Sequence, residues 1–288
     1  MILMYDDACF IANGFMNHNS SFAPNLQQLP RQTEIDIRGC FTAGKGNSLI
    51  VLDFSQEEIR LAAALSKDID MINAYKNGLD LHLLTANKIF NLGLTEEQLK
   101  EGTEEYKKAK EKYKAERTKA KTIVFGMLYG MPEYTLSKNL KISLEEALKL
   151  ISDYFEAYHG VKKSIDECHR QIKHKGFIRN YYGRYRRFKP ENGAYKAEHY
   201  KQGYNFLIQG TAADLLRVSM NNLLKFLKAN GNEGKIVLTV HDEICIEVPS
   251  NNAEFYLKNM KEIMEKSLDI EPALIAEGSI GKTYSEAK

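Results

Sequence analysis

Two groups of carboxylates follow apolar, β-branched segments that lie far apart in the sequence. Asp53 comes directly after the run LIVL, and Asp242 with Glu243 lies between two further strand-like segments. Two carboxylates brought together repel each other unless divalent cations neutralise them. Because Mg²⁺ favours one or two carboxylates plus phosphate oxygens, the pattern indicates metal-dependent phosphoryl transfer. Taken singly, each position also fits an ordinary acidic turn.

A second group of residues recurs every four positions along one segment. Four residues of an α-helix advance by about 400°, so each side chain lies about 40° round from the one before. Two cations and then two aromatics therefore form one stripe, which can hold a polyphosphate and meet a sugar or base one turn further on. The alternative is an ordinary helix that is solvated at one end and buried at the other. That alternative does not explain why the cations lie in one line with the aromatics. The stripe consists of Arg117, Lys121, Phe125 and Tyr129.

The elements that must position these groups are a few strands and many helices. Residues 46–56 contain a buried strand that gives way to a helix over 57–68, so Asp53 lies at the turn. The segments KIVLTV and ICIEV predict a hairpin with residues 241–243 as its tight connection. This pattern predicts an α+β fold. Further helical segments are predicted over 80–92, 95–130 with a break near Gly102, 131–140, 143–176, 205–231 and 251–269. Capping boxes are predicted at Thr95 and Ser143, and a second hairpin over 176–188.

Composition excludes several classes of protein. The 288 residues suffice for one large domain or two smaller ones, and 43% hydrophobic with 27% charged residues excludes wholesale disorder, collagen and coiled coil. No apolar run is long enough for a transmembrane helix, and the N-terminal residues do not resemble a signal peptide. The cysteines form no CxxC pair, so we expect reduced thiols rather than a zinc site. They are Cys9, Cys40, Cys168 and Cys245.

Charge is distributed unevenly although the net charge is only +2. Residues 162–189 hold ten Lys or Arg and two acids, whereas residues 242–271 hold eight acids and three Lys. Basic residues interleaved with Tyr and Phe suit a phosphate backbone with bases nearby. A solvated helix face and loop is the alternative for this segment.

These segments resemble the motifs of family A DNA polymerases, the bacterial polymerase I type. Residues 53–60 (DFSQEEIR) resemble motif A, residues 117–130 resemble motif B, and residues 240–243 (VHDE) resemble motif C. Residues 209–214 (QGTAAD) and 24–27 (PNLQ) resemble two further elements of the family. The five segments occur in the family's order, and the resemblance runs from about residue 11 to residue 288.

The resemblance implies a right-hand polymerase fold with an antiparallel palm sheet and helical fingers. The first part of the palm, with motif A, is expected over 1–94, the fingers with the motif B helix over 95–160, and the second palm part with motif C over 161–288. From the length we expect no thumb and no exonuclease domain in this chain. A separate chain that supplies those functions, a fragment and a naturally compact enzyme are the alternatives.

The implied activity is template-directed addition of dNTPs to a primer 3′-OH without proofreading, using two Mg²⁺ ions, with Mn²⁺ as an alternative. Asp53, Asp242 and the Phe54 carbonyl would ligate the ions, and Glu243 would be an accessory carboxylate near the primer end. The implied partners are primer–template DNA and dNTPs, with no membrane, in the cytoplasm or nucleoid. A catalytically reduced DNA-binding subunit is the alternative. A metal-dependent nuclease would not explain the Arg–Lys–Phe–Tyr stripe.

Further roles follow from the same resemblance. Lys121 would bind the triphosphate and protonate the pyrophosphate, Phe125 would meet the sugar, and Tyr129 would lie by the templating base. Glu58 would exclude the 2′-OH, unless it is only a solvated Glu at a helix start. His82 matches a triphosphate-contacting His, with a capping or core His as the alternative. The implied nucleotide-binding residues are Arg117, Lys121, Phe125, Tyr129, Gln56, Glu58 and His82, and the implied DNA-binding residues are Asn25, Arg184, Lys201, Asn205, Gln209 and His241.

Three positions depart from the family pattern. Glu57 replaces a usual apolar residue and is expected either to alter the nucleotide pocket or to point to solvent. His18 lies where an Arg commonly contacts the primer end. Tyr284 stands where a Trp is frequent, and we expect it to serve packing only.

Overall fold

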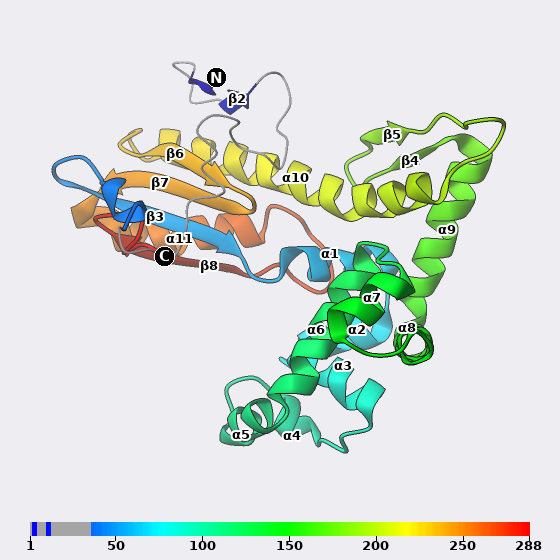
Figure 1. Ribbon diagram of the computed structural model, residues 1–288. Coiled ribbons are helices and arrows are strands. Elements are labelled where there is room, and N and C mark those ends of the chain that lie inside the picture. The colour runs from blue at the N-terminus through cyan, green and yellow to red at the C-terminus, as the bar shows by residue number, and fades with distance from the viewer. Residues whose placement is uncertain (1, 5–9, 13–35) are drawn as a thin grey trace. The chain divides into compact units, whose positions relative to one another are not determined.

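The computed structural model describes residues 2–4, 10–12 and 36–288 of the chain (Figure 1). Within these residues the chain divides into two units, one formed by Met1–Glu57 with Ala212–Lys288 and the other by Glu58–Thr211. His18 and Asn25 lie outside the described residues. No helix in the described part of the chain is both long and apolar enough to cross a membrane.

The first unit is built on a four-stranded antiparallel sheet with the strand order β6-β7-β3-β8. The predicted strand before Asp53 is the central strand β3 (Asn47–Phe54), and it is buried along almost its whole length. The predicted hairpin is β6 (Lys235–Val240) and β7 (Glu243–Pro249). Sheet and helices together confirm the α+β class. The remaining elements of this unit are β1 (Ile2–Met4), β2 (Phe10–Ala12), a 3₁₀ turn η2 (Arg38–Cys40), another, η3 (Ser250–Asn252), α11 (Ala253–Glu265) and β8 (Ala276–Gly281).

Side chains that alternate along the strands fill the two faces of this sheet. Leu49 and Val51 of β3 join Val240 and Tyr284 in a buried apolar cluster on one side. On the other side α11 packs against β3, β7 and β8. Gly278 makes this approach close, since a Cβ there would meet the Leu257 side chain at 3.0 Å. The strand ends are therefore fixed by packing on both faces of the sheet.

The second unit is mainly helical, and its core is where α3 (Leu81–Phe90), α6 (Lys114–Leu128) and α8 (Leu144–Ala157) meet. The fully buried Tyr158 lies there, and its hydroxyl pairs with that of Thr85 at 2.7 Å. Both predicted capping boxes are present, at the starts of α4 and α8. The other elements are α1 (Glu57–Ser66), α2 (Ile69–Lys76), α4 (Glu96–Leu99), α5 (Glu104–Lys112), α7 (Glu133–Leu140), α9 (His159–Lys175) and the hairpin of β4 (Phe177–Arg179) and β5 (Tyr185–Arg187).

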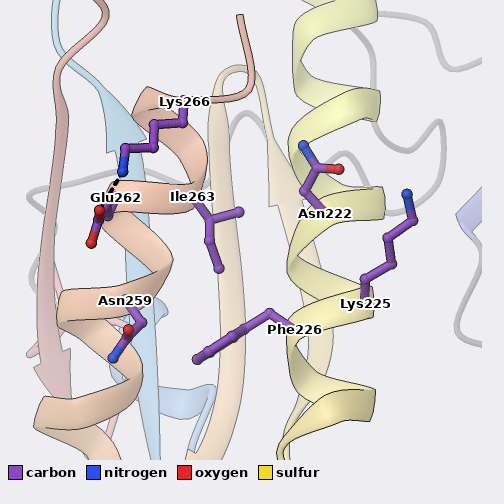
Figure 2. A pocket seen from close by; sticks show the side chains of 7 residues that line it. All are labelled: Asn222, Lys225, Phe226, Asn259, Glu262, Ile263 and Lys266. Atoms are coloured by element: carbon purple, nitrogen blue, oxygen red, sulfur yellow. Dashed lines mark hydrogen bonds and ion pairs between the residues drawn. The ribbon is translucent and has the colours of Figure 1, made fainter.

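Helix α10 (Ala197–Ala229) is continuous across the boundary of the two units, and it begins eight residues before the helix predicted from residue 205. In the first unit a surface groove of about 430 Å³ opens between α10 and α11. Figure 2 shows Ile263 of α11 and Phe226 of α10 pointing into the space between the two helices, and Lys266 paired with Glu262 beside α11. The Asn222 amide donates to the Ser267 hydroxyl, so these polar groups bond to neighbours and mark no ligand site.

Candidate active site

The register of the sheet brings the two predicted carboxylate groups together. The last residue pair between β3 and β7 joins Leu52 to Ile244. One residue further, β3 reaches Asp53, and β7 reaches Glu243 beside the two-residue connection to β6. The side chains of Asp53 and Asp242 share a hydrogen bond. Residues 189 positions apart in the sequence thus meet at one end of the sheet because antiparallel pairing places a strand end beside a hairpin turn.

The electrostatic environment of Asp53 is unfavourable for its charged form. Burial and the negative charge of Asp242 raise its pKa to about 6, and Glu277, its partner on β8, adds to the shift. Lys288 opposes the shift. In addition, Asp53 Oδ1 is buried without a hydrogen-bond partner among the described residues. A carboxylate pair with an unsatisfied oxygen is a strong candidate to bind a cation.

The donors at this end of the sheet fit Mg²⁺ that is shared with substrate. Among the described residues no group of three or more His, Cys, Asp or Glu could form an all-protein metal cage. Mg²⁺ does not require such a cage, since it commonly takes one or two carboxylates and completes its shell with water and phosphate oxygens. Asp53 and Asp242 supply two carboxylates, and Phe54, the last residue of β3, follows Asp53 directly. Together with the unsatisfied Asp53 oxygen, this set is compatible with the predicted divalent ions.

Glu243 is held by residues that the sequence did not point to. It is the first residue of β7 rather than part of the turn, and only 2% of its surface is exposed. The Tyr284 hydroxyl donates to one carboxylate oxygen and the Lys288 ammonium to the other. The expectation that Tyr284 serves packing only is therefore wrong. Its ring also lies 5.4 Å from the Arg38 guanidinium, so the tyrosine links two charged groups.

The predicted stripe on α6 is continuous in the second unit. The Phe125 and Tyr129 rings stack with centroids 6.2 Å apart and an interplanar angle of 17°. The ammonium of Lys121, which is exposed, lies 5.9 Å from the Phe125 centroid, and the His82 ring lies 5.9 Å from the same centroid. The aromatic rings and the Lys121 ammonium of α6 therefore lie on the face of α6 that is next to the N-terminal turn of α3. The helix ends at Leu128, followed by Gly130 with a φ of +63°.

Arg117 and His82 are tied to the start of α3. Arg117 Nε donates to the buried Asp80 carboxylate at 2.7 Å. His82 is buried, and this burial is the main cause that lowers the pKa of its imidazole to about 4. The charge of Asp80 raises this pKa, and the charges of Arg117 and Lys121 lower it. The imidazole is therefore neutral at pH 7, and its Nδ1 is buried with no hydrogen-bond partner in the described part of the chain.

Three predicted DNA-binding residues lie on one face of α10. Lys201, Asn205 and Gln209 follow one another at intervals of four, so their side chains form a row. All three are half-buried, and Asn205 Oδ1 is buried with no hydrogen-bond partner within the described ranges. The Lys201 stem lies against Gly130 at the end of α6.

The remaining predicted residues lie in a hairpin, in a turn and at the start of a helix. Arg184 is exposed in the β4–β5 hairpin, and its backbone N–H donates to Asn180 Oδ1 at 2.9 Å. His241 is exposed in the β6–β7 turn with a φ of +58°. Gln56, with a φ of +53°, and Glu58 lie at the transition from β3 to α1. Their neighbour Glu57 is 4% exposed, so the expectation that it could point to solvent is wrong.

Comparisons with known proteins identify the family of the chain. The protein-family model described as DNA polymerase family A matches residues 17–286 of this chain. DNA polymerase I of Lactococcus lactis is 33% identical over 274 residues, and the thermostable DNA polymerase I of Thermus thermophilus is 34% identical over 275 residues. These matches cover 93% of this chain but only 30% and 31% of the two relatives. The chain therefore spans about a third of the length of these curated relatives.

Structural similarity leads to the same family. The chain resembles the solved polymerase domain of Pol1 from M. smegmatis, in complex with DNA primer-template and dNTP. The TM-score is 0.78 at 31% sequence identity, and the match covers 92% of this chain and 45% of that one. The family match extends over all the motifs from residue 24 to residue 243. By sequence and by structure, this chain belongs to DNA polymerase family A.

Proposed function

We propose that this chain catalyses template-directed addition of dNTPs to a primer 3′-OH by metal-dependent phosphoryl transfer. The observation that carries the proposal is the Asp53–Asp242 pair, whose shared hydrogen bond and unsatisfied oxygen suit divalent ions. Family membership supports it, as does the related domain that was solved with primer-template and dNTP. The partners proposed are therefore primer–template DNA and dNTPs. We further propose that residues 1–94 and 161–288 serve as the palm and residues 95–160 as the fingers.

The residues at the strand ends would hold the metal ions and orient the primer end. Asp53, Asp242 and the Phe54 carbonyl would hold two Mg²⁺ ions, which lower the pKa of the primer hydroxyl and neutralise charge on the phosphates. Glu243, fixed by Tyr284 and Lys288, would lie near the primer end as an accessory carboxylate.

The α6 stripe would receive the nucleotide. Arg117 and Lys121 would bind the triphosphate, and Lys121, exposed and cationic, would deliver a proton to the pyrophosphate. Phe125 would pack on the sugar and Tyr129 beside the templating base, with the ring planes nearly parallel. His82, neutral at pH 7, would donate a hydrogen bond to a phosphate oxygen without adding charge. Glu58, with Gln56 beside it, would exclude the 2′-OH.

Contacts to the duplex would come from α10 and the exposed turns. The row formed by Lys201, Asn205 and Gln209 would contact the minor groove and backbone, with Arg184 and His241 as further contacts. Minor-groove acceptors differ little between base pairs, so such contacts suit an enzyme that must accept every sequence.

The substitution Asp242→Asn tests the reaction. It removes one carboxylate of the pair, so we expect single-nucleotide primer extension to fall by about 10²- to 10³-fold, the range seen when charge stabilisation of a transition state is lost. Primer–template affinity, measured by fluorescence anisotropy, should change less than about threefold. Asp269→Asn, at an exposed position of the same unit, is the matched control and should extend normally. Extension by Asp242→Asn at the wild-type rate would refute the metal role, and no extension by the wild-type chain would favour the DNA-binding subunit.

A further inference from the structure

One carboxylate joins both sides of the proposed triphosphate site. Asp80 is 2% exposed and accepts four hydrogen bonds. Its Oδ1 accepts the backbone N–H groups of His82 and Leu83 at 2.9 and 3.0 Å, which caps α3. Its Oδ2 accepts Arg117 Nε at 2.7 Å and the Tyr106 hydroxyl at 3.0 Å. A buried carboxylate with this set of donors has a defined position and orientation.

The ion pair with Asp80 also fixes the guanidinium of Arg117. The bond uses Nε, and among the described residues the two terminal nitrogens make no hydrogen bond, so they can donate to a ligand. The Arg117 side chain is 25% exposed, so it is neither wholly enclosed nor free to rotate in solvent. Burial alone would raise the pKa of Asp80, but the hydrogen bonds from Arg117 and the Leu83 amide lower it below its usual value. The pair is therefore ionised at neutral pH.

Tyr106 holds this carboxylate from a third element, α5. Its ring is buried in an apolar cluster with Leu83, Leu99 and Ala109, and its hydroxyl points to Asp80. The backbone N–H of Asp80 donates to the Leu99 carbonyl at 2.9 Å. The segment of α4 and α5, which is rich in charged residues, thus supports the start of α3 through both backbone and side-chain hydrogen bonds.

His82 is placed by the same carboxylate. Asp80 Oδ1 binds its backbone N–H, and the imidazole lies over Phe125 at 5.9 Å between centroids. The buried Nδ1, which has no partner in the part of the chain that the structure describes, is a polar atom at the stripe still to be satisfied. Helix α3 therefore presents His82 and helix α6 presents Arg117 as phosphate-binding candidates, and Asp80 bonds directly to both residues.

We infer that Asp80, supported by Tyr106, is a positioning residue that holds Arg117 and His82 at the spacing needed to bind one nucleoside triphosphate. This inference rests on the proposed function, because it gives the stripe the triphosphate as ligand. Asp80 itself touches no substrate in this role. It sets the geometry of two groups that do, and its loss should weaken nucleotide binding more than it slows the chemical step.

The test is steady-state single-nucleotide incorporation with Asp80→Asn and Tyr106→Phe in the full chain. Asn keeps an oxygen for the α3 cap but loses the charge that orients Arg117, so KM for the dNTP should rise roughly tenfold while kcat changes less than about threefold. Tyr106→Phe keeps the buried ring and should raise KM by about twofold to fourfold. Lys107→Met, an exposed position next to Tyr106, is the control and should leave KM unchanged.

A double-substitution cycle separates positioning from a general structural role. In an Arg117→Ala background, Asp80→Asn should raise KM less than about twofold, because Arg117, which depends on the Asp80 charge, is already absent and the Asn oxygen still caps α3 at His82. An unchanged KM in Asp80→Asn, or the same tenfold rise in both backgrounds, would overturn the inference. If the wild-type chain fails to extend a primer, the proposed function fails. Isothermal titration of dNTP into the same variants then decides the positioning role, and equal affinity of wild type and Asp80→Asn, or no binding by either, overturns it.

Discussion

Asp53 lies among charges of both signs: burial, Asp242 and Glu277 raise its pKa, and Lys288 lowers it. The apolar pattern of the sequence predicted that Asp53 and Asp242 follow strand-like segments. The resemblance to one family's motifs predicted that the two carboxylates meet. It could not predict Glu277 or Lys288 at the same place, since neither residue follows a recognisable pattern and both arrive through the pairing of β8 and the packing of the C-terminal residues.

The raised pKa gives Asp53 a defined effect on stability. The folded state holds its proton up to about pH 6, whereas the ordinary value is 3.8, so proton binding stabilises the fold at low pH and this stabilisation is lost as pH rises from about 4 to about 6. At pH 8 the ionised pair repels. Asp53→Asn should therefore raise Tm by about 2 °C or more at pH 8 in the presence of a chelator, and by less at pH 4.5.

Cations should reverse this difference. Mg²⁺ added at pH 8 should raise the Tm of the wild-type chain and have a smaller effect on Asp53→Asn, because a ligand that binds only the folded state stabilises it. Asp269→Asn controls for the loss of a surface charge. A variant that is less stable than wild type at pH 8 would contradict the repulsion that we assign to the pair.

Asp80 and Tyr106 show a different limit of sequence reasoning at this scale. Helix 80–92 was predicted to begin at Asp80, which is consistent with its capping role, and the helix begins at Leu81. Nothing in the spacing indicates that the same carboxylate accepts bonds from Arg117 and Tyr106, 37 and 26 residues away. Such long-range bonds depend on how helices pack, and periodicity does not determine packing.

Among the secondary-structure elements, regular ones were predicted well and weakly patterned ones were not. Strand β3, the β6–β7 hairpin and the capped helices have clear apolar periodicity or capping residues, and the structure contains them. Strand β8 (AEGSIG) was missed, because its two glycines give it little β-propensity and, at the edge of the sheet, Ala276 alone among its residues is buried. Pairing with β3 alone makes it a strand.

The glycine that follows the C-terminal end of α6 can be tested by substitution with alanine. Gly130 has a φ of +63°, and a Cβ there would lie 3.1 Å from Lys201 Cγ. Gly78 has a similar φ of +68° but open space around it. Replacing either by Ala should cost about 1 kcal/mol for the left-handed backbone. Gly130→Ala should cost a few tenths of a kcal/mol more than Gly78→Ala in urea unfolding, since the Lys201 stem must move. Equal costs would show that the approach of Lys201 is unimportant.

At the scale of the whole molecule, the two units differ in how the chain builds them. The helical unit, Glu58–Thr211, is one continuous segment, whereas the sheet-bearing unit joins residues from both sides of it. Its central strand β3 comes from the first part of the chain, and its neighbours β7 and β8 come from the last part. The sheet therefore cannot form until residues about 200 positions apart in the chain meet, which makes β3 the element on which this unit depends.

Ile50, at the middle of β3, tests that dependence. It is fully buried and pairs with Ile246 on one side and Ile280 on the other. Ile50→Ala should destabilise the sheet-bearing unit by roughly 2–5 kcal/mol through lost burial and a cavity. Hydrogen exchange should then become faster for the amides of β3, β7 and β8, while those of α3 and α6 keep most of their protection, since local stability follows the cooperative unit to which an amide belongs. A uniform loss of protection across both units would instead show that the chain unfolds as one cooperative body.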